Sequence, residues 1–160
     1  MFHIVLHQPE IPPNTGNIIR LCANTGCTLH LVKPLGFDIG RRAVRRAGLD
    51  YRDLAQLRLH EDLEACFQEL GVARIFTVET GAAHRYCDAH FQRGDTVLFG
   101  SERRGLPQSV LERIPAERQL AIPMCRGNRS LNLSNAVALV VYEAWRQNDF
   151  IGCAATGFPP

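Results

Sequence analysis

Six short runs rich in β-branched and other apolar residues alternate along this chain with segments of helical pattern. Strands are expected at residues 2–7, 28–33, 56–60, 74–78, 96–99 and 119–122. Helices are expected from about residue 14 to Gly26, from 61 to 70, and from about 133 to 147. Alternation of strand and helix is typical of α/β proteins with parallel strands. We therefore predict a mainly parallel sheet flanked by helices.

The length of 160 residues is close to that of one domain, and no internal repeat or linker divides the chain. We expect a single domain over residues 1–150 and a loose tail over 151–160. The longest apolar stretch, residues 136–141, is far shorter than a membrane span. The first residues lack the basic lead of a signal peptide, so we expect a cytoplasmic protein without a membrane partner.

All but one of the 18 basic residues are arginine, and several of them cluster. The planar guanidinium fits phosphate groups, so the clusters could form a nucleic-acid footprint. An arginine-rich coding bias combined with solvated faces explains the composition equally well. The clustered residues are Arg41, Arg42, Arg45, Arg46, Arg103, Arg104, Arg126 and Arg129.

Three segments that follow predicted strands could carry chemistry, because α/β proteins assemble ligand sites at strand ends. The first is residues 12–20, where Asn14 or Thr15 could cap a helix and Arg20 lies two turns further on. The second is residues 99–107, with Gly100 and Gly105 as turn residues. It lacks the Lys and Ser/Thr that a nucleotide-binding P-loop needs, so triphosphate binding is disfavoured.

The third segment, residues 122–135, leads into the last helix and is crowded with small polar side chains. A helix cap uses one or two such side chains, which leaves others able to bind a ligand. These side chains are Ser130, Asn132, Ser134 and Asn135.

The dinucleotide-binding fingerprint G-x-G-x-x-G is missing after the first strand. The six histidines lack metal-ligand spacing, and the six cysteines include no C-x-x-C pair. We therefore expect free thiols and no metal.

The last helix is apolar on nearly every face between residues 137 and 145. Such a helix must be covered on two sides, and a second copy of the chain is the simplest cover. We expect a homodimer whose interface includes Val141, Tyr142 and Trp145.

Together, the three segments resemble the three motifs of the SPOUT class of RNA methyltransferases. N-T-G-N-I-I-R comes first, F-G-S-E-R-R-G-L-P comes late, and I-P-M with R-S-L-N-L-S-N-A-V leads into the last helix. The resemblance covers nearly the whole chain in the right order. It implies an α/β domain ending in a deep trefoil knot that holds S-adenosylmethionine.

Within that class the chain is similar to the small bacterial tRNA (cytidine/uridine) 2'-O-methyltransferases, down to R-L-C-A-N-T-G and V-Y-E-A-W-R-Q. This resemblance implies methyl transfer to the ribose 2'-hydroxyl of the wobble nucleotide, in the anticodon region of tRNA. The departures are Ser101, where relatives often carry proline, and residues 125–128.

The resemblance also implies roles for particular residues. The cofactor would contact Val78, Gly100, Ile122, Ser130, Leu131 and Asn132, and Tyr142 would lie toward RNA or the dimer partner. The catalytic candidates are Asn14, Arg20 and Glu102. A guanidinium is a poor base at neutral pH, so we favour Arg20 as an anchor for a phosphate or ribose oxygen. The sequence leaves open whether Arg20 serves its own chain or its partner.

Two alternatives stand beside this interpretation. One is a non-catalytic RNA-binding or ribosome-assembly protein, which intact motifs disfavour. The other is a ribosomal RNA ribose methyltransferase, whose members usually carry an added N-terminal RNA-binding domain.

Overall fold

The computed structural model describes residues 1–38, 56–71 and 74–153. Within them, seven strands form one sheet in the order β3-β2-β1-β6-β4-β7-β5, and every pairing is parallel. The predicted α/β architecture with a parallel sheet flanked by helices is confirmed. The arginines at 41, 42, 45 and 46 and the tail residues 154–160 lie outside the described residues.

Seven strands are described, and all but the fifth match the predicted runs to within one residue at each end. They are β1 (His3–His7), β2 (Thr28–Val32), β3 (Leu57–His60), β4 (Ile75–Val78), β5 (His84–Arg85), β6 (Thr96–Phe99) and β7 (Gln119–Ala121). The helices are α1 (Pro12–Thr25), α3 (Leu63–Leu70), α4 (Gln108–Leu111) and α5 (Leu133–Arg146), with 3-10 turns η2 (Tyr86–Asp88) and η3 (Ala116–Arg118). The strand β5 has only two residues and carries no pattern that sequence reasoning could detect.

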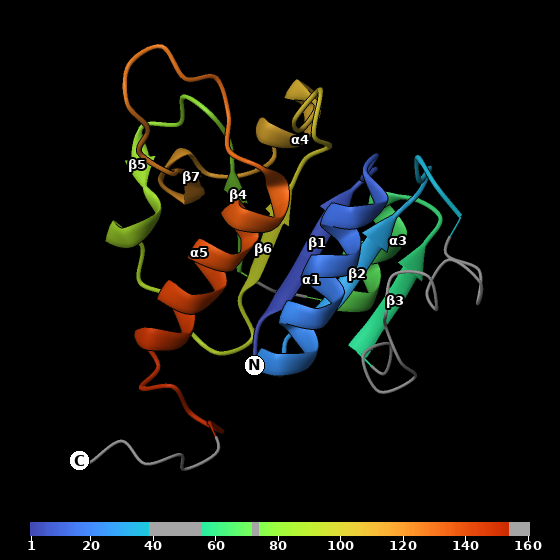
Figure 1. Ribbon diagram of the computed structural model, residues 1–160, viewed down its shortest axis with the longest axis horizontal. Helices are drawn as coiled ribbons and strands as arrows, with labels where there is room; N and C mark the ends of the chain where they lie inside the picture. Colours follow the sequence, from blue (N-terminus) through green and yellow to red (C-terminus); the bar gives the residue numbers. More distant parts are fainter. Residues whose placement is uncertain (39–55, 72–73, 154–160) are drawn as a thin grey trace.

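Helices cover both faces of the sheet, and α1 and α5 lie side by side in front of it in Figure 1. Ile4 and Leu6 of β1 pack toward α1 and α5, whereas Val5 packs toward α3 and α4. Successive side chains of a strand point to opposite faces, so one strand serves both core layers. Each fully buried side chain of this kind contributes roughly 1.5–3 kcal/mol.

The helix α1 begins earlier than predicted and is not capped by Asn14 or Thr15. It starts at Pro12, with Ile11 at the cap position and no side-chain cap bond. Proline suits this place because its missing N–H would have no partner inside the helix. The prediction of an Asn14 or Thr15 cap is therefore wrong, and Asn14 is left for other contacts. The stop at Gly26 is confirmed, with a φ of 71°.

The apolar run in α5 is divided between the core and the surface. Val137, Val140 and Val141 are fully buried within this chain, whereas Leu139 and Tyr142 are exposed. Placing Val141 in a dimer interface is therefore wrong, because its side chain packs in the chain's own core. Within the described parts of the chain, no helix has the length and apolar character that crossing a membrane requires.

A chain of hydrogen-bonded histidines crosses three strands on one side of the sheet. His3 Nδ1 lies 3.0 Å from His30 Nε2, and His30 Nδ1 lies 2.9 Å from His60 Nε2. Burial is the main reason that the pKa of His30 is lowered to about 4 and that the pKa of His3 is lowered too. The folded state therefore favours neutral rings at His3 and His30.

The histidine chain predicts loss of stability in mild acid. As the pH falls below 6.5, His30 of the unfolded chain binds a proton, whereas buried His30 of the folded chain stays neutral. The free energy of unfolding therefore falls as the pH drops toward about 4. Between about pH 7 and pH 5, His30 should contribute a loss on the order of 2 kcal/mol. Urea unfolding at both pH values measures this loss. His30→Phe should reduce the pH dependence and exposed His90→Gln should not; equal slopes in all three proteins would contradict the assignment.

Candidate functional site

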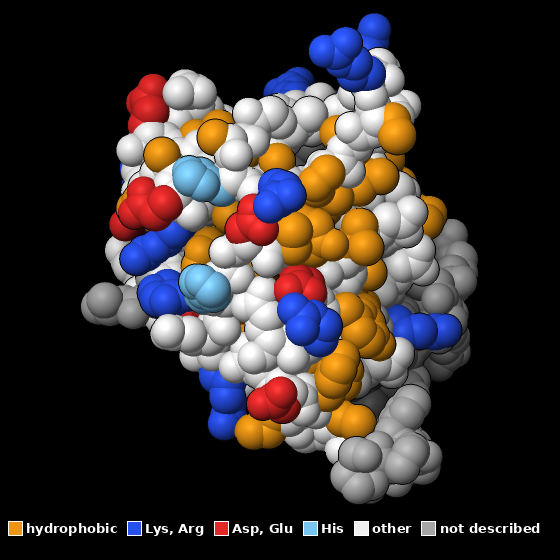
Figure 2. All heavy atoms as spheres, turned by 90° about the vertical axis from the view of Figure 1, so that its left-hand side faces the viewer, with side chains coloured by type: hydrophobic (Ala, Val, Ile, Leu, Met, Phe, Trp, Pro, Cys, Tyr) orange, Lys and Arg blue, Asp and Glu red, His pale blue; other side chains and the backbone are white. Residues whose placement is uncertain are grey.

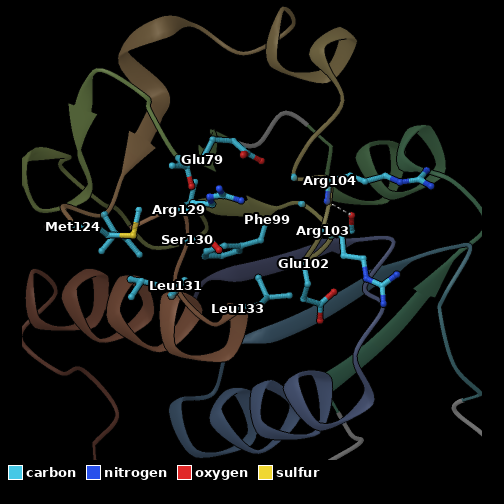
Figure 3. Close-up of a pocket in the computed structure, with 17 residues that line it drawn as sticks. Glu79, Phe99, Glu102, Arg103, Arg104, Met124, Arg129, Ser130, Leu131 and Leu133 are labelled. Carbon is cyan, nitrogen blue, oxygen red and sulfur yellow. Dashed lines mark hydrogen bonds between the residues drawn. The ribbon is translucent and has the colours of Figure 1, made fainter. Parts of the chain in front are cut away.

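A cavity of about 440 Å³ lies at the carboxyl ends of β4, β6 and β7 (Figure 3). Its walls come from three stretches of chain, namely residues 78–80, 99–105 and 122–136. The carboxyl ends of parallel strands meet at one edge of a sheet, which is where open α/β folds place their ligands. The cavity therefore occupies the position that the sequence motifs predicted.

The loop after β6 is a tight turn that only glycine permits. Gly105 has a φ of 65°, and its N–H donates to the Ser101 carbonyl over 2.9 Å. A Cβ on Gly100 would collide with the backbone of Gly105 and Leu106. The loop thus brings main chain directly against the cavity, as a ligand that contacts backbone atoms requires.

The wall across from this loop is apolar and comes mainly from the segment that leads into α5. Ile122, Leu131 and Leu133 line it, together with Phe99 at the end of β6. Figure 3 shows Leu131 and Leu133 on one side of the cavity, with Phe99 between them and Glu79 in that view. An apolar wall facing exposed main chain and a few charges suits an amphipathic small molecule such as a nucleoside.

A hydrogen-bond network joins the three predicted motifs beside the cavity. The Glu102 carboxylate accepts from the backbone N–H of Glu10 at 2.7 Å, from the N–H of Ile11 at 3.2 Å, and from the Asn14 amide at 3.0 Å. The side-chain oxygen of Asn14 then accepts from the side-chain N–H of Asn132 at 2.9 Å. The start of α1, the loop after β6 and the start of α5 are therefore held in one arrangement.

Asn132 caps α5. The cap occupies some of the small polar side chains of the third motif. The Asn132 side-chain oxygen accepts from the N–H groups of Ser134 and Asn135 and from the Ser134 hydroxyl. Ser130 is exposed and lines the cavity, so it is the side chain left for a ligand.

The cavity gathers most of the residues predicted for cofactor binding. Those that line it are Val78, Gly100, Ile122, Ser130 and Leu131, together with the catalytic candidate Glu102. Asn14 and Asn132 do not line it and bond to each other. Arg20 is exposed on α1 and Tyr142 is exposed on α5, and neither lines the cavity.

Glu79 is the lining residue that the sequence motifs missed. It follows β4, its Oε1 accepts the Leu106 N–H over 2.6 Å, and its Oε2 lies beside Gly105. Burial raises the pKa of this carboxyl above its usual range, and backbone hydrogen bonds partly offset the shift. The one available signal was its place directly after a strand that ends at the site.

Among the described residues, one cluster of side chains of metal-ligating type lies away from this cavity. Ligand atoms of His30, His60 and Cys66 lie within 4.8 Å of one another and all three residues are buried. The spacing of these residues along the sequence gave no hint of this cluster. The 2.9 Å between its two imidazole nitrogens is a hydrogen-bond distance, and the six thiols of the chain are free.

Comparisons with known proteins agree with this geometry. The model of the SpoU rRNA methylase family matches residues 1–142. A tRNA (cytidine(34)-2'-O)-methyltransferase of Methylovorus glucosotrophus is 54% identical over 152 residues, which cover 95% of this chain and 99% of that protein. The resemblance to the SPOUT RNA methyltransferases is thereby confirmed.

Solved structures give the same result. A protein described in connection with 2'-OH methylation of C/U34 on tRNA matches with a TM-score of 0.86 and 46% identity, over 94% of this chain and 97% of that one. A putative RNA methyltransferase from Bacillus anthracis matches with a TM-score of 0.89 and 37% identity, over 99% of this chain and 100% of that one. The chain belongs to the SpoU rRNA methylase family.

Proposed function

We propose that this chain transfers a methyl group from S-adenosylmethionine to the ribose 2'-hydroxyl of the wobble nucleotide of tRNA, in the cytoplasm. The observation that carries the proposal is the cavity at the carboxyl ends of β4, β6 and β7, which the second and third family motifs line and to which Asn14 of the first motif is joined through Glu102. Relatives with identities of about half are named for this reaction at position 34. The intact lining favours an enzyme over a non-catalytic RNA-binding protein, and those names favour tRNA over ribosomal RNA.

The residues present fit this cofactor. The lack of a Cβ at Gly100 leaves backbone close to the cavity, Leu131 and Ile122 offer apolar contact, and Ser130 offers a hydroxyl. S-adenosylmethionine, when bound, supplies an electrophilic methyl group on a positively charged sulfur. The protein then has to align a ribose oxygen with that methyl group, and such alignment can account for much of the rate enhancement.

We also propose that the segments around the cavity form the deep trefoil knot of the SPOUT class. Family membership supports this, and so does the sheet order. Because β4 lies between β6 and β7, the segments that follow all three strands meet at one edge.

The network of Glu102, Asn14 and Asn132 is a positioning device in this proposal. Its hydrogen bonds join the start of α1, the loop after β6 and the start of α5, so the network would act on the substrate through the segments that it fixes. The Glu102 carboxylate, which accepts from main chain and side chain alike, sets the distance between α1 and the loop after β6. Asn14 thereby links Glu102 to the start of α5.

Exposed arginines near the cavity suit the phosphates of an RNA. Arg103, Arg104 and Arg129 line the cavity and are exposed. The ion pair of Arg103 with Glu10 spans 3.6 Å on a side chain that is 84% exposed, so it holds Arg103 only weakly. Arg20 on α1 completes this set as the proposed anchor of the reacting nucleotide.

The protein is proposed to act as a homodimer through the exposed side of α5. Hydrophobic side chains gather in a band on the face that carries α5 and β5 (Figure 2). The α5 apolar surface consists of Leu139, Tyr142, Trp145, Phe150 and Ile151, of which all but Trp145 are more than 40% exposed. The Trp145 ring contacts the rings of Tyr142 and Phe150 edge to face. A contiguous apolar patch of this kind commonly marks a protein interface.

The assignment predicts a specific product. Purified protein with S-adenosylmethionine and unmodified tRNA should place a 2'-O-methyl group on the wobble nucleotide, which mass spectrometry of the digested tRNA detects. Leu131→Arg puts bulk and a charge into the apolar wall, so cofactor binding measured by calorimetry should weaken at least about tenfold. The matched control is Leu59→Arg, an exposed leucine on β3 outside the cavity. Folded wild type that binds no cofactor, or that methylates ribosomal RNA alone, would refute the proposal.

The proposed anchor role of Arg20 predicts that its substitution reduces methyl transfer and leaves cofactor affinity unchanged. Arg20→Lys keeps the charge but lacks the planar fork, so an anchor that binds two oxygens should lose on the order of 2 kcal/mol, about thirtyfold in transfer rate. Single-turnover methylation and calorimetry measure the two effects separately. Arg93→Lys, an exposed arginine in the turn before β6 and away from the cavity, is the control. Near wild-type transfer by Arg20→Lys would leave Arg20 as a general positive charge only.

The α5 apolar surface predicts a dimer at micromolar concentration in light scattering. Tyr142→Glu introduces a charge that dimerisation would have to desolvate, so the dimer should weaken at least about tenfold. Leu59→Glu changes a side chain of equal exposure, 50% against 48%, on a different element and should leave the dimer intact. A monomeric wild type would rule out this assembly.

A further inference from the structure

Glu79 places a negative charge inside a cavity whose other charged residues are mostly arginines. It lines the cavity from the end of β4, while Arg103, Arg104 and Arg129 line it with exposed side chains. Glu79 itself is half-buried, so its charge is less screened by water than theirs. Figure 3 shows it across Phe99 from Leu131 and Leu133.

The Glu79 carboxylate is fixed in place but not neutralised. The N–H groups of Leu106 and Thr80 donate to it, which determines where the side chain points. Among the described residues, Glu79 takes part in none of the ion pairs. Two neutral donors orient a carboxylate without cancelling its charge, so Glu79 keeps a negative charge at this side of the cavity.

Burial of an unpaired carboxylate is unfavourable unless a cation compensates for it. The raised pKa of Glu79 shows that its two hydrogen bonds do not fully offset the lost hydration. A ligand that brings positive charge into the cavity would therefore be favoured over a neutral ligand of the same shape.

We propose that Glu79 makes this cavity selective for charge, so that it holds the cationic methyl donor more tightly than the demethylated product. The proposal rests on the proposed assignment of the cavity to S-adenosylmethionine. Methyl transfer breaks the bond between methyl carbon and sulfur, and the sulfur keeps the bonding electron pair. The ribose oxygen gains the methyl group and releases its proton to water, and the positive sulfonium becomes a neutral thioether. The product therefore has one positive charge fewer than the donor.

This change of charge at the sulfur gives Glu79 a role in turnover. The carboxylate attracts the donor before transfer and loses most of that attraction once the sulfur is neutral. At an effective dielectric constant of about 20, opposite charges several ångströms apart change affinity by about tenfold or more. Glu79 thereby weakens product retention relative to donor binding.

The test compares the affinities of the two cofactor forms by calorimetry at pH 7. Glu79→Gln removes the charge and keeps an oxygen that can accept the Leu106 N–H. We expect S-adenosylmethionine to bind about tenfold more weakly, which is about 1.4 kcal/mol, and the demethylated product to change by less than about twofold. Glu117→Gln, which removes an exposed carboxylate in η3 outside the cavity, should alter neither affinity.

Equal weakening of both ligands would overturn the proposal, because Glu79 would then only position the loop. Unchanged affinities would overturn it as well. Wild type that binds neither ligand would instead refute the assignment of the cavity to the cofactor.

A pH series on the wild type gives a second, independent readout that does not depend on the folding of a variant. Burial raises the pKa of Glu79, so lowering the pH from 7 into the acid range should protonate it and reduce the donor's advantage over the product, because both ligands share the same amino acid portion. A donor-to-product affinity ratio that stays flat over this range would overturn the proposal.

Discussion

The Glu102 carboxylate is the contact on which the arrangement of the site depends. It accepts hydrogen bonds from the two backbone N–H groups that precede α1 and from the Asn14 side chain in its first turn. Asn14 passes the constraint on to Asn132, which caps α5. Charge-assisted hydrogen bonds are stronger than neutral ones, so one carboxylate can fix three segments that are far apart in the sequence. Without these hydrogen bonds, nothing in the network would hold the starts of α1 and α5 against the loop after β6.

The parallel sheet supplies the second constraint. Because every strand in it runs the same way, the segments after β4, β6 and β7 emerge at the same edge. Gly100 and Gly105 let the middle loop fold tightly, so backbone rather than side chain forms much of the cavity surface. Charges divide by depth, with Glu79 half-buried inside and arginines exposed around it. That division suits a small cationic ligand within and a polyanionic partner outside.

Sequence reasoning located most strands because their pattern depends on local residues. It failed where a side chain had more than one possible partner. Asn14 has the chemistry of a helix cap, yet it bonds Glu102 and Asn132, while Pro12 begins the helix. Val141 belongs to a run that looks apolar on all sides, yet the core of this chain buries it. Periodicity shows that a helix needs cover on several faces, and tertiary packing decides which face the chain covers for itself.

The sequence by itself determined the α/β class, the order of the elements and the three motifs, because strand propensity, glycine turns and polar clusters are local properties. It also determined the family, since the motif order spans nearly the whole chain. Only the tertiary structure decided that Asn132 bonds Asn14, that Glu79 lines the cavity, and that His3, His30 and His60 share hydrogen bonds. Those facts depend on distances between segments far apart in the chain, and such distances are fixed by packing of the whole sheet and its helices.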